Sequence, residues 1–339
     1  MPTTSLFQSL SVSIPDPQSP HISRPSFLRT AKRKIKGLLL LPYQAVILAN
    51  RSHQKLRGQA EDSMQPKSVT KAQSQLRHFT AEIKSATHPF KMLLLRPGYI
   101  EDHIAEGGAW EPNLSSLMRF FMKTDGVFLD VGANIGFHTL SIASSFPQAK
   151  CIAFEPNRLI NAQLNCNIRL NDHLTNIVTY DIAISDRSGD IDFYMQKASS
   201  YNRGLSSTSY NYDMEGQDIE KVRVKMERLD EVLEDAVQDK VSVIKIDTQG
   251  SECQVLCGAT QIIEKSKPVI FFEFEVDYHK ADPEGKFKQI LAQFSSCDYQ
   301  VFLINAEIDQ TFQAFDVAEI CKIPRFEGDF IALPNRLLA

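Results

Sequence analysis

The sequence lacks any long hydrophobic run. Its longest apolar stretch, at residues 37–49, covers about 13 residues, whereas a helix that spans a bilayer needs roughly 20. We therefore predict no membrane-spanning helix. Cysteine is also sparse, with 6 in 339 residues, and the cysteines are spread along the chain in mostly apolar or helical surroundings. This distribution favours a reduced interior over a disulfide framework.

A strong positive charge is absent too. The formal net charge is -4, with 37 basic and 41 acidic residues, which gives no general reason to expect binding to nucleic acid. A metal-ligating cluster is also missing, because Cys253 and Cys257 have no histidine or further cysteine nearby in the sequence. We therefore expect neither a nucleic-acid partner nor a bound metal. The oligomeric state stays open.

Residues 1–70 differ in composition from the rest, so we divide the chain into a basic, partly disordered N-terminal extension, 1–70, and a folded domain, 71–339. Asp16 is the only acidic residue before Glu61, and a basic cluster at 29–36 leads into the apolar stretch. Three interpretations stay open: a docking helix or poorly ordered extension, peripheral attachment to a membrane surface through residues 29–49, or a targeting segment. We expect a cytoplasmic protein, with or without that membrane contact.

Hydrophobic periodicity predicts alternating strands and helices over the rest of the chain. Strands are expected at 91–96, 127–130, 151–154, 177–181, 191–194, 222–225, 241–246, 269–273, 299–304 and 330–333, and helices at 70–86, 114–121, 158–170, 252–265 and 285–294. We expect segments 222–225 and 241–246 to pair, and the last two strands to form an antiparallel pair at one edge. The alternation is typical of an α/β fold with a mostly parallel sheet and helices on both faces.

A glycine-rich turn joins the strand that ends at Asp130 to a helical pattern that begins at Thr139. Such a strand–turn–helix unit is the usual nucleotide-cofactor corner of an α/β sheet. The spacing is Gly-x-x-x-Gly, from Gly132 to Gly136, and Asn134 stands where a pyrophosphate-binding loop has its second glycine. That glycine lets the backbone approach a pyrophosphate. Its absence favours a cofactor without one, and S-adenosyl-L-methionine fits.

Four residues in and just before this turn have an expected role in cofactor binding. Gly132 and Gly136 let the loop pass close to the cofactor, and Asn134 tolerates left-handed backbone angles. Asp130 either orients the amides of the loop or faces the ammonium group of the cofactor.

Carboxylates also follow the predicted strands, where ligands bind in such sheets. The four are Asp130, Glu155, Asp247 and Glu273. Glu155 lies 25 positions after Asp130 and directly before Pro156, where an acid can accept hydrogen bonds from both ribose hydroxyls. The alternative is a helix-capping or solvated acid.

The adenine is expected after the third strand, near residues 181–184, with Asp181 and Ala183 as candidate contacts. Further along, residues 199–212 form a long polar loop, and loops of more than about 12 to 15 residues are often functional lids. We expect this loop to cover the acceptor, with a plain disordered insertion as the alternative.

Several motifs occur in a fixed order. They are Asp-Val-Gly-Ala-Asn-Ile-Gly at 130–136, Phe-Glu-Pro at 154–156, Ala-Ile-Ser-Asp at 183–186, Leu-Asp at 229–230, Lys-Ile-Asp-Thr-Gln-Gly-Ser-Glu at 245–252, Gly-Ala at 258–259 and Glu273. With this set the chain resembles the FkbM family of S-adenosylmethionine-dependent methyltransferases. The resemblance implies a Rossmann-like, seven-stranded fold and O-methylation of a hydroxyl on a sugar, glycolipid or secondary metabolite. Gln249 departs from the pattern, because many members carry glutamate there.

The sulfonium of the cofactor already activates the methyl group, so the protein must mainly align the acceptor oxygen, which alone can be worth about 7 kcal/mol or more. A base that removes the hydroxyl proton would help. Asp247 is our first candidate, because the end of its strand lies beside the methyl group in such sheets, and Glu273 is the second. His138 and His279 are weaker candidates. The bland alternatives are a helix cap for Asp247 and a paired acid for Glu273.

Two other functions stay open beside an O-methyltransferase that acts on a small-molecule or glycan hydroxyl. One is a nicotinamide-dependent oxidoreductase on a Rossmann sheet, which the missing pyrophosphate loop disfavours. The other is a non-catalytic cofactor-binding module at a membrane surface, which the complete set of strand-end carboxylates disfavours. Nothing in the sequence identifies the acceptor.

Overall fold

The computed structural model describes residues 77–84, 88–197, 200–209, 214, 218–305 and 311–338. The predictions for residues 1–70, with the basic cluster and the apolar stretch, lie outside the described residues. Within the described ranges, no helix is both long enough and apolar enough to cross a membrane.

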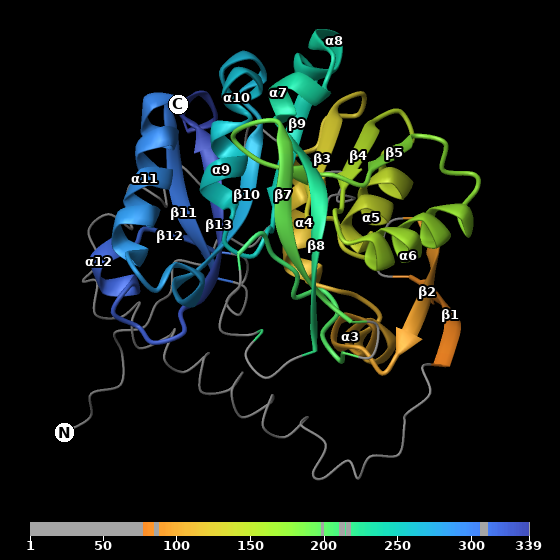
Figure 1. Ribbon diagram of the computed structural model, residues 1–339. Coiled ribbons are helices and arrows are strands. Elements are labelled where there is room, and N and C mark those ends of the chain that lie inside the picture. The colour runs from red at the N-terminus through yellow and green to blue at the C-terminus, as the bar shows by residue number, and fades with distance from the viewer. Residues whose placement is uncertain are drawn as a thin grey trace, which may run out of the picture.

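Eight strands form the central sheet, in the order β12-β11-β13-β10-β9-β3-β4-β5 (Figure 1). Their bounds are β3 Val127–Val131, β4 Lys150–Phe154, β5 Ile177–Tyr180, β9 Val241–Ile246, β10 Val269–Glu275, β11 Tyr299–Asn305, β12 Thr311–Gln313 and β13 Glu327–Pro334. The strands from β10 to β5 run parallel, and β13 lies antiparallel between β10 and β11. The expected mostly parallel sheet with an antiparallel edge is confirmed. The short β12 adds one strand to the seven that the resemblance implies.

Helices cover both faces of this sheet (Figure 1). Their bounds are α3 Tyr99–Gly107, α4 Pro112–Phe121, α5 Phe137–Ser145, α6 Arg158–Arg169, α7 Leu229–Val232, α8 Asp235–Gln238, α9 Glu252–Cys257, α10 Thr260–Ser266, α11 Pro283–Ser296 and α12 Val317–Ile320, with 3-10 turns at Val276–His279 and Asn335–Leu337. Successive residues of a strand point to opposite faces. On β3, Phe128 therefore packs in a core with α4 and α5, whereas Leu129 packs in a core with α9, α10 and α11.

The predicted helix at 70–86 is wrong over its described part, and residues 70–76 and 85–86 lie outside the described residues. Residues Arg77–Ile83 form strand β1, which pairs antiparallel with β2, Phe90–Arg96, in a separate two-stranded sheet. A helical face would have buried Phe79 together with Ile83, but Phe79 is exposed and Ile83 is buried. The pairing with β2, which the sequence period did not reveal, decides the local structure. Helix α3, which follows β2, was also not predicted.

The predicted pairing of 222–225 with 241–246 is wrong as well. Strand β8, Ile219–Glu227, lies between β6, Ala183–Ile184, and β7, Gly189–Gln196, in a three-stranded sheet. Strand β9 instead lies between β3 and β10. The physical reason is burial, because every residue of β9 is buried, whereas β8 consists of exposed and partly buried residues apart from the buried Met226.

The predicted helix at 252–265 is divided into α9 and α10. Gly258 lies at the break and packs against the carbonyl of Ser185, where a Cβ atom would overlap that oxygen. Ser185 directly follows β6, so the close approach of the three-stranded sheet ends α9.

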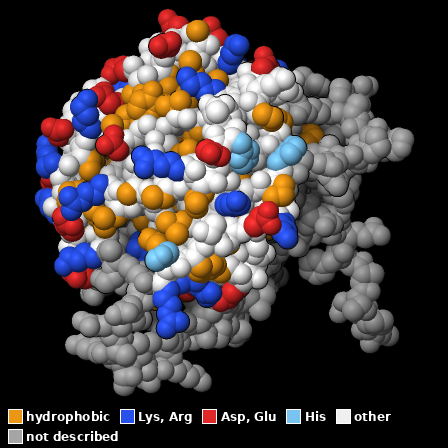
Figure 2. All heavy atoms as spheres, turned by 90° about the vertical axis from the view of Figure 1, so that its right-hand side faces the viewer, with side chains coloured by type: hydrophobic (Ala, Val, Ile, Leu, Met, Phe, Trp, Pro, Cys, Tyr) orange, Lys and Arg blue, Asp and Glu red, His pale blue; other side chains and the backbone are white. Residues whose placement is uncertain are grey.

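The face at the β5 edge of the central sheet carries hydrophobic side chains among charged ones (Figure 2). Leu159 and Leu170 at the two ends of α6, and Val178 on β5, are exposed. Single exposed hydrophobic residues are normal on a protein surface, so this face has no assigned role.

Candidate active site

The glycine turn after β3 has the backbone that the sequence predicts. Gly132, Asn134 and Gly136 all have left-handed φ angles, of 79°, 50° and 87°. Gly136 caps the N-terminus of α5. At Gly132 a Cβ atom would overlap the carbonyl oxygen of Asp247. Glycine is therefore required there because the ends of β3 and β9 touch.

Glu155 connects the ends of β3 and β4. Its side chain lies almost entirely inside the protein, at 7% exposure, and its two carboxylate oxygens accept from the backbone amides of Asn134, at 2.9 Å, and Asn157, at 2.8 Å. Burial raises the pKa of Glu155 to about 7, although these two hydrogen bonds oppose the rise. The residue thus lies at the predicted cofactor corner and holds the two loops of that corner together.

Asp130 lies deeper than the sequence indicated, with 0% exposure. Its Oδ2 accepts from Thr139 Oγ1 at 2.5 Å, and its Oδ1 has no hydrogen-bond partner among the described residues. That Oδ1 lies 4.0 Å from Lys245 Nζ. Asp130 therefore does not orient the loop amides in this structure, and its nearest charge is a lysine of β9.

Lys245 is a site residue that our sequence reasoning missed. It is buried on β9 between two carboxylates, and its Nζ donates to Asp247 Oδ2 at 3.0 Å. Burial lowers the pKa of Lys245. The negative charges of Asp247 and Asp130 raise it by more, so the net shift is upward. The signal was a lysine within the otherwise uncharged strand 241–246, since lysine is rarely buried unless it is paired.

Asp247 and Glu273, the two predicted base candidates, share one neighbour. Gln249 Nε2 donates to Asp247 Oδ1 at 3.0 Å and to Glu273 Oε2 at 3.2 Å. The hydroxyl of Tyr278 donates to Gln249 Oε1. Gln249 has a left-handed φ of 56°, and it thus presents its amide between the two carboxylates.

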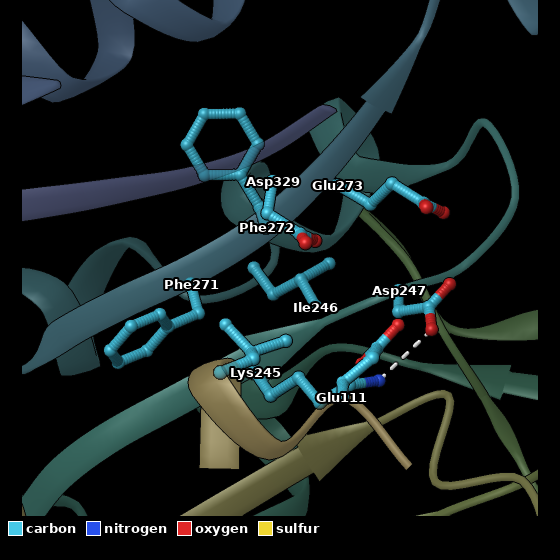
Figure 3. A pocket seen from close by; sticks show the side chains of 9 residues that line it. Glu111, Lys245, Ile246, Asp247, Phe271, Phe272, Glu273 and Asp329 are labelled. Carbon is cyan, nitrogen blue, oxygen red and sulfur yellow. Dashed lines mark hydrogen bonds and ion pairs between the residues drawn. The ribbon is translucent and has the colours of Figure 1, made fainter. Parts of the chain in front are cut away.

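A pocket lies at the ends of β9 and β10 (Figure 3). Its lining residues are Glu111, Leu114, Lys245, Ile246, Asp247, Phe271, Phe272, Glu273 and Asp329. Both predicted base candidates border it, together with Glu111 before α4 and Asp329 on β13, which the sequence reasoning did not identify. The pocket is thus polar on its carboxylate side and apolar toward Phe271 and Phe272.

The pKa values of the two predicted carboxylates are shifted in opposite directions. Burial raises the pKa of Asp247, but Lys245 and the hydrogen bond from Gln249 lower it, so the net shift is downward. Burial and the neighbouring charge of Asp247 both raise the pKa of Glu273 well above its ordinary value. Titratable pairs whose pKa values are pushed apart are typical of acid–base sites.

Neither histidine candidate lines the pocket. His138 is buried on α5, where Nδ1 lies 3.0 Å from Ser115 Oγ and Nε2 lies 3.0 Å from Glu111 Oε2, and burial lowers its pKa to about 3. His279 stacks on Phe274, and burial lowers its pKa to about 4. Both side chains thus pack in the interior and do not face the pocket.

The predicted adenine region follows β5, next to β4. Asp181 is exposed there, and Ala183 is buried on β6. The loop predicted as a lid is described from Ser200 to Ser209. It lies across both sites: Ser206 Oγ accepts from Asn157 Nδ2 at 3.0 Å, and Ser207 Oγ donates to the carbonyl of Gln249 at 2.8 Å.

In the described part of the chain, no group of three or more histidine, cysteine, aspartate or glutamate residues could hold a metal ion.

Residues 130–301 match the model of the methyltransferase FkbM domain. The chain belongs to the FkbM methyltransferase family. This match begins at Asp130 and includes Glu155, Asp247 and Glu273, so the resemblance predicted from the motifs is confirmed.

Two relatives of the chain carry names that describe an activity. The chain is 28% identical over 159 residues to the 2-O-methyltransferase NoeI of Sinorhizobium fredii, covering 44% of this chain and 64% of that protein. It is 30% identical over 161 residues to the hexuronic acid methyltransferase AglP of Haloferax volcanii, covering 47% of this chain and 61% of that protein. The chain thus matches less than two thirds of the length of either relative.

Among solved structures, the FkbM methyltransferase of Methylobacillus flagellatus matches with 17% sequence identity and a TM-score of 0.39, covering 62% of this chain and 44% of that one. The fold assignment rests on the strand order of the central sheet itself.

Proposed function

We propose that this protein is an S-adenosyl-L-methionine-dependent O-methyltransferase that acts on a hydroxyl of a sugar, glycolipid or secondary metabolite. One observation carries the proposal: Gly132, in the cofactor turn, lies against the backbone of Asp247, at the rim of the carboxylate pocket. A cofactor at the first site and an acceptor at the second would therefore be neighbours. Family membership supports methyl transfer, and the names of the two relatives support a sugar-like hydroxyl acceptor.

The residues of the first site fit this cofactor. The turn from Gly132 to Gly136 lacks the glycine that a pyrophosphate needs. Glu155 offers a buried carboxylate whose two oxygens each accept one hydrogen bond from a backbone amide, and a carboxylate has about four acceptor positions. The 2′ and 3′ hydroxyls of a ribose would use the remaining positions.

When bound, S-adenosyl-L-methionine supplies an electrophilic methyl group that an alcohol oxygen can attack. The tasks left to this chain are to orient that oxygen and to remove its proton. Lys245 and Gln249 each donate a hydrogen bond to one carboxylate oxygen of Asp247. These bonds stabilise the ionised form of Asp247, which is therefore suited to orient the hydroxyl as a hydrogen-bond acceptor. Glu273, in its ionised form, is then the base that takes the proton. Gln249 holds the two carboxylates in a fixed relation.

Calorimetric titration with S-adenosyl-L-methionine tests the cofactor, with NAD as the ligand control. We expect binding of the methyl donor alone, and weaker binding by Glu155→Ala. The matched control is Glu264→Ala, which removes an exposed glutamate of α10. Failure of the folded wild type to bind the methyl donor would overturn the proposal, and binding of NAD would favour the oxidoreductase.

The pH dependence of that affinity is a sharper prediction. Ribose hydroxyls donate to the ionised form of Glu155, whose pKa is about 7. Affinity should therefore rise roughly tenfold between one pH unit below and one above that pKa. Glu155→Gln should bind weakly with little dependence on pH. An equally steep rise in the variant would assign the titration to another group.

The acceptor class is tested by transfer of a radiolabelled methyl group to a panel of neutral glycosides, uronic acids and hydroxylated polyketides. An ether product should keep its label when it is treated with base. Incorporation should be lost in Glu273→Gln, because the proposed base is removed. Cofactor binding without transfer to any hydroxyl would favour the non-catalytic module.

A further inference from the structure

Residues 200–208, between β7 and β8, form a segment that we call the strap. Its central residues contact the ends of three strands of the central sheet. Gly204 packs so closely on Asn134 of the glycine turn that a Cβ atom would overlap the side-chain amide. Beyond Gly204, Ser206 bonds Asn157 after β4, and Ser207 bonds Gln249 after β9. The strap therefore crosses the outer side of the proposed cofactor corner.

A buried arginine fixes the strap to the segment that precedes the central sheet. Arg203 Nη2 donates to Glu101 Oε1 on α3 and to the carbonyl of Leu95, each at 2.5 Å, and Nη1 donates to the carbonyl of Pro97 at 2.9 Å. The arginine and glutamate side chains are only 6% and 5% exposed. Loss of one member of a buried ion pair leaves an uncompensated charge, so Arg203 strongly favours the attached position of the strap.

We infer that Arg203 is a positioning residue for the cofactor: it ties the strap to α3 so that the strap closes the outer wall of the cofactor corner. This inference rests on the proposed function, because the corner must bind a ligand for its wall to matter. Arg203 itself contacts neither Glu155 nor the pocket, so its effect is transmitted through Gly204, Ser206 and Ser207.

The protein contains one tryptophan, and it reports on this attachment. Trp110 packs edge-to-face against Tyr99, with ring centres 5.9 Å apart. Tyr99 in turn donates its backbone amide to the carbonyl of Tyr201 in the strap at 2.9 Å, and the two tyrosine rings lie 6.2 Å apart. A change in the strap should therefore alter the emission of Trp110.

The test uses the full-length protein and S-adenosylhomocysteine as the probe, with calorimetry and tryptophan fluorescence as readouts. We expect the wild type to bind and its emission to change. Arg203→Gln should bind roughly tenfold or more weakly and lack the ligand-induced change. Arg223→Gln, which removes an exposed arginine of β8 paired with Asp192, is the matched control and should behave as wild type.

A second variant protects the test against misfolding. Gly204→Ala leaves the arginine and its partners intact but crowds Asn134, so it should weaken binding with an unchanged melting temperature. If Arg203→Gln and Gly204→Ala both bind as wild type, the inference is overturned while the proposed function stands. If the wild type itself does not bind the probe, the proposed function fails and the inference fails with it.

Discussion

Lys245 makes two carboxylates of one pocket chemically different. It donates to Asp247 and lies near Asp130, whereas Glu273 accepts a hydrogen bond from Gln249. The buried cation therefore stabilises the charge of Asp247, while Glu273 is left with burial and a neighbouring negative charge. A carboxylate with a raised pKa is the stronger proton acceptor once it is ionised, so we prefer Glu273, the second candidate from the sequence, as the base.

Glu273→Gln should lower kcat by roughly 100-fold to 10,000-fold with little effect on cofactor affinity. Because the base must be ionised, and because its pKa is raised well above its ordinary value, wild-type kcat should fall as the pH falls through that raised pKa. Radiolabelled methyl transfer across a pH series measures both. Asp247→Asn, the matched isosteric change, should raise the KM for the acceptor more than it shifts the pH profile of kcat. Full kcat in Glu273→Gln would exclude Glu273 as the base.

At this scale the sequence located Glu155, Asp247 and Glu273, because carboxyl ends of parallel strands meet at one edge of a sheet. Glu111 and Asp329 could not be found in the same way. Glu111 precedes a helix, and Asp329 belongs to an antiparallel strand whose pairing opposite Glu273 is set by the folded sheet. No sequence period encodes those approaches.

The turn between β9 and α9 is the element that presents Gln249. Glu252 stabilises it from within, because its Oε1 accepts from the amide of Thr248 at 3.2 Å, the hydroxyl of Thr248 at 3.0 Å and the amide of Gly250 at 3.1 Å. Gln249 and Gly250 have positive φ angles of 56° and 102°. Three accepted hydrogen bonds thus hold a turn that its own backbone preferences disfavour.

Glu252→Ala should therefore disorder this turn. Three lost hydrogen bonds at about 1 kcal/mol each predict a loss of roughly 2 to 3 kcal/mol in the free energy of unfolding, together with a lower kcat, because Gln249 no longer holds the carboxylates. Cofactor affinity should change less, since Glu155 lies on another loop. Urea unfolding and calorimetry measure the two effects. Equal losses of cofactor affinity and kcat would contradict the assignment of the turn to the acceptor side.

The elements that the sequence mispredicted all depend on contacts across the chain. Strand β1 exists because β2 pairs with it, and β8 pairs with β7 rather than with its successor β9. The parallel core, in contrast, was predicted well, because buried strands such as β3 and β9 are apolar almost throughout. Local pattern thus determined the centre of the sheet, and tertiary pairing determined its additions.

In the whole molecule, the site depends on segments that lie before the family match. That match begins at residue 130, yet Glu111 lines the pocket and Glu101 holds the strap. Both precede residue 130 and follow the β1–β2 sheet. Residues near 100 are therefore part of the functional unit, although their sequence carries none of the family motifs.

Several buried titratable groups combine in the pH dependence of folding. His138 and His279 have folded pKa values depressed to about 3 and about 4, so the stability that they contribute is lost as the pH falls below 6.5, their unfolded value. Glu155 and Glu273 have raised folded pKa values. Their contribution is lost as the pH rises from 4.5, so it is regained on acidification toward 4.5. The two effects oppose each other between about pH 6.5 and 4.5.

Below pH 4.5 the histidines still take up protons on unfolding, His279 until about pH 4 and His138 until about pH 3, and so does Asp247, whose folded pKa is lowered. His138 should therefore contribute a loss of about 1.4 kcal/mol per pH unit in the free energy of unfolding as the pH falls from 6.5 toward its folded pKa of about 3. In His138→Gln one of these protons is removed, so the variant should gain stability relative to wild type as the pH falls. Urea unfolding of wild type, His138→Gln and the exposed control His173→Gln measures the slopes. If the difference in the free energy of unfolding between wild type and His138→Gln did not depend on pH, His138 would have the same pKa in the folded and unfolded protein. The prediction that burial beside Ser115 and Glu111 keeps His138 neutral would then be wrong.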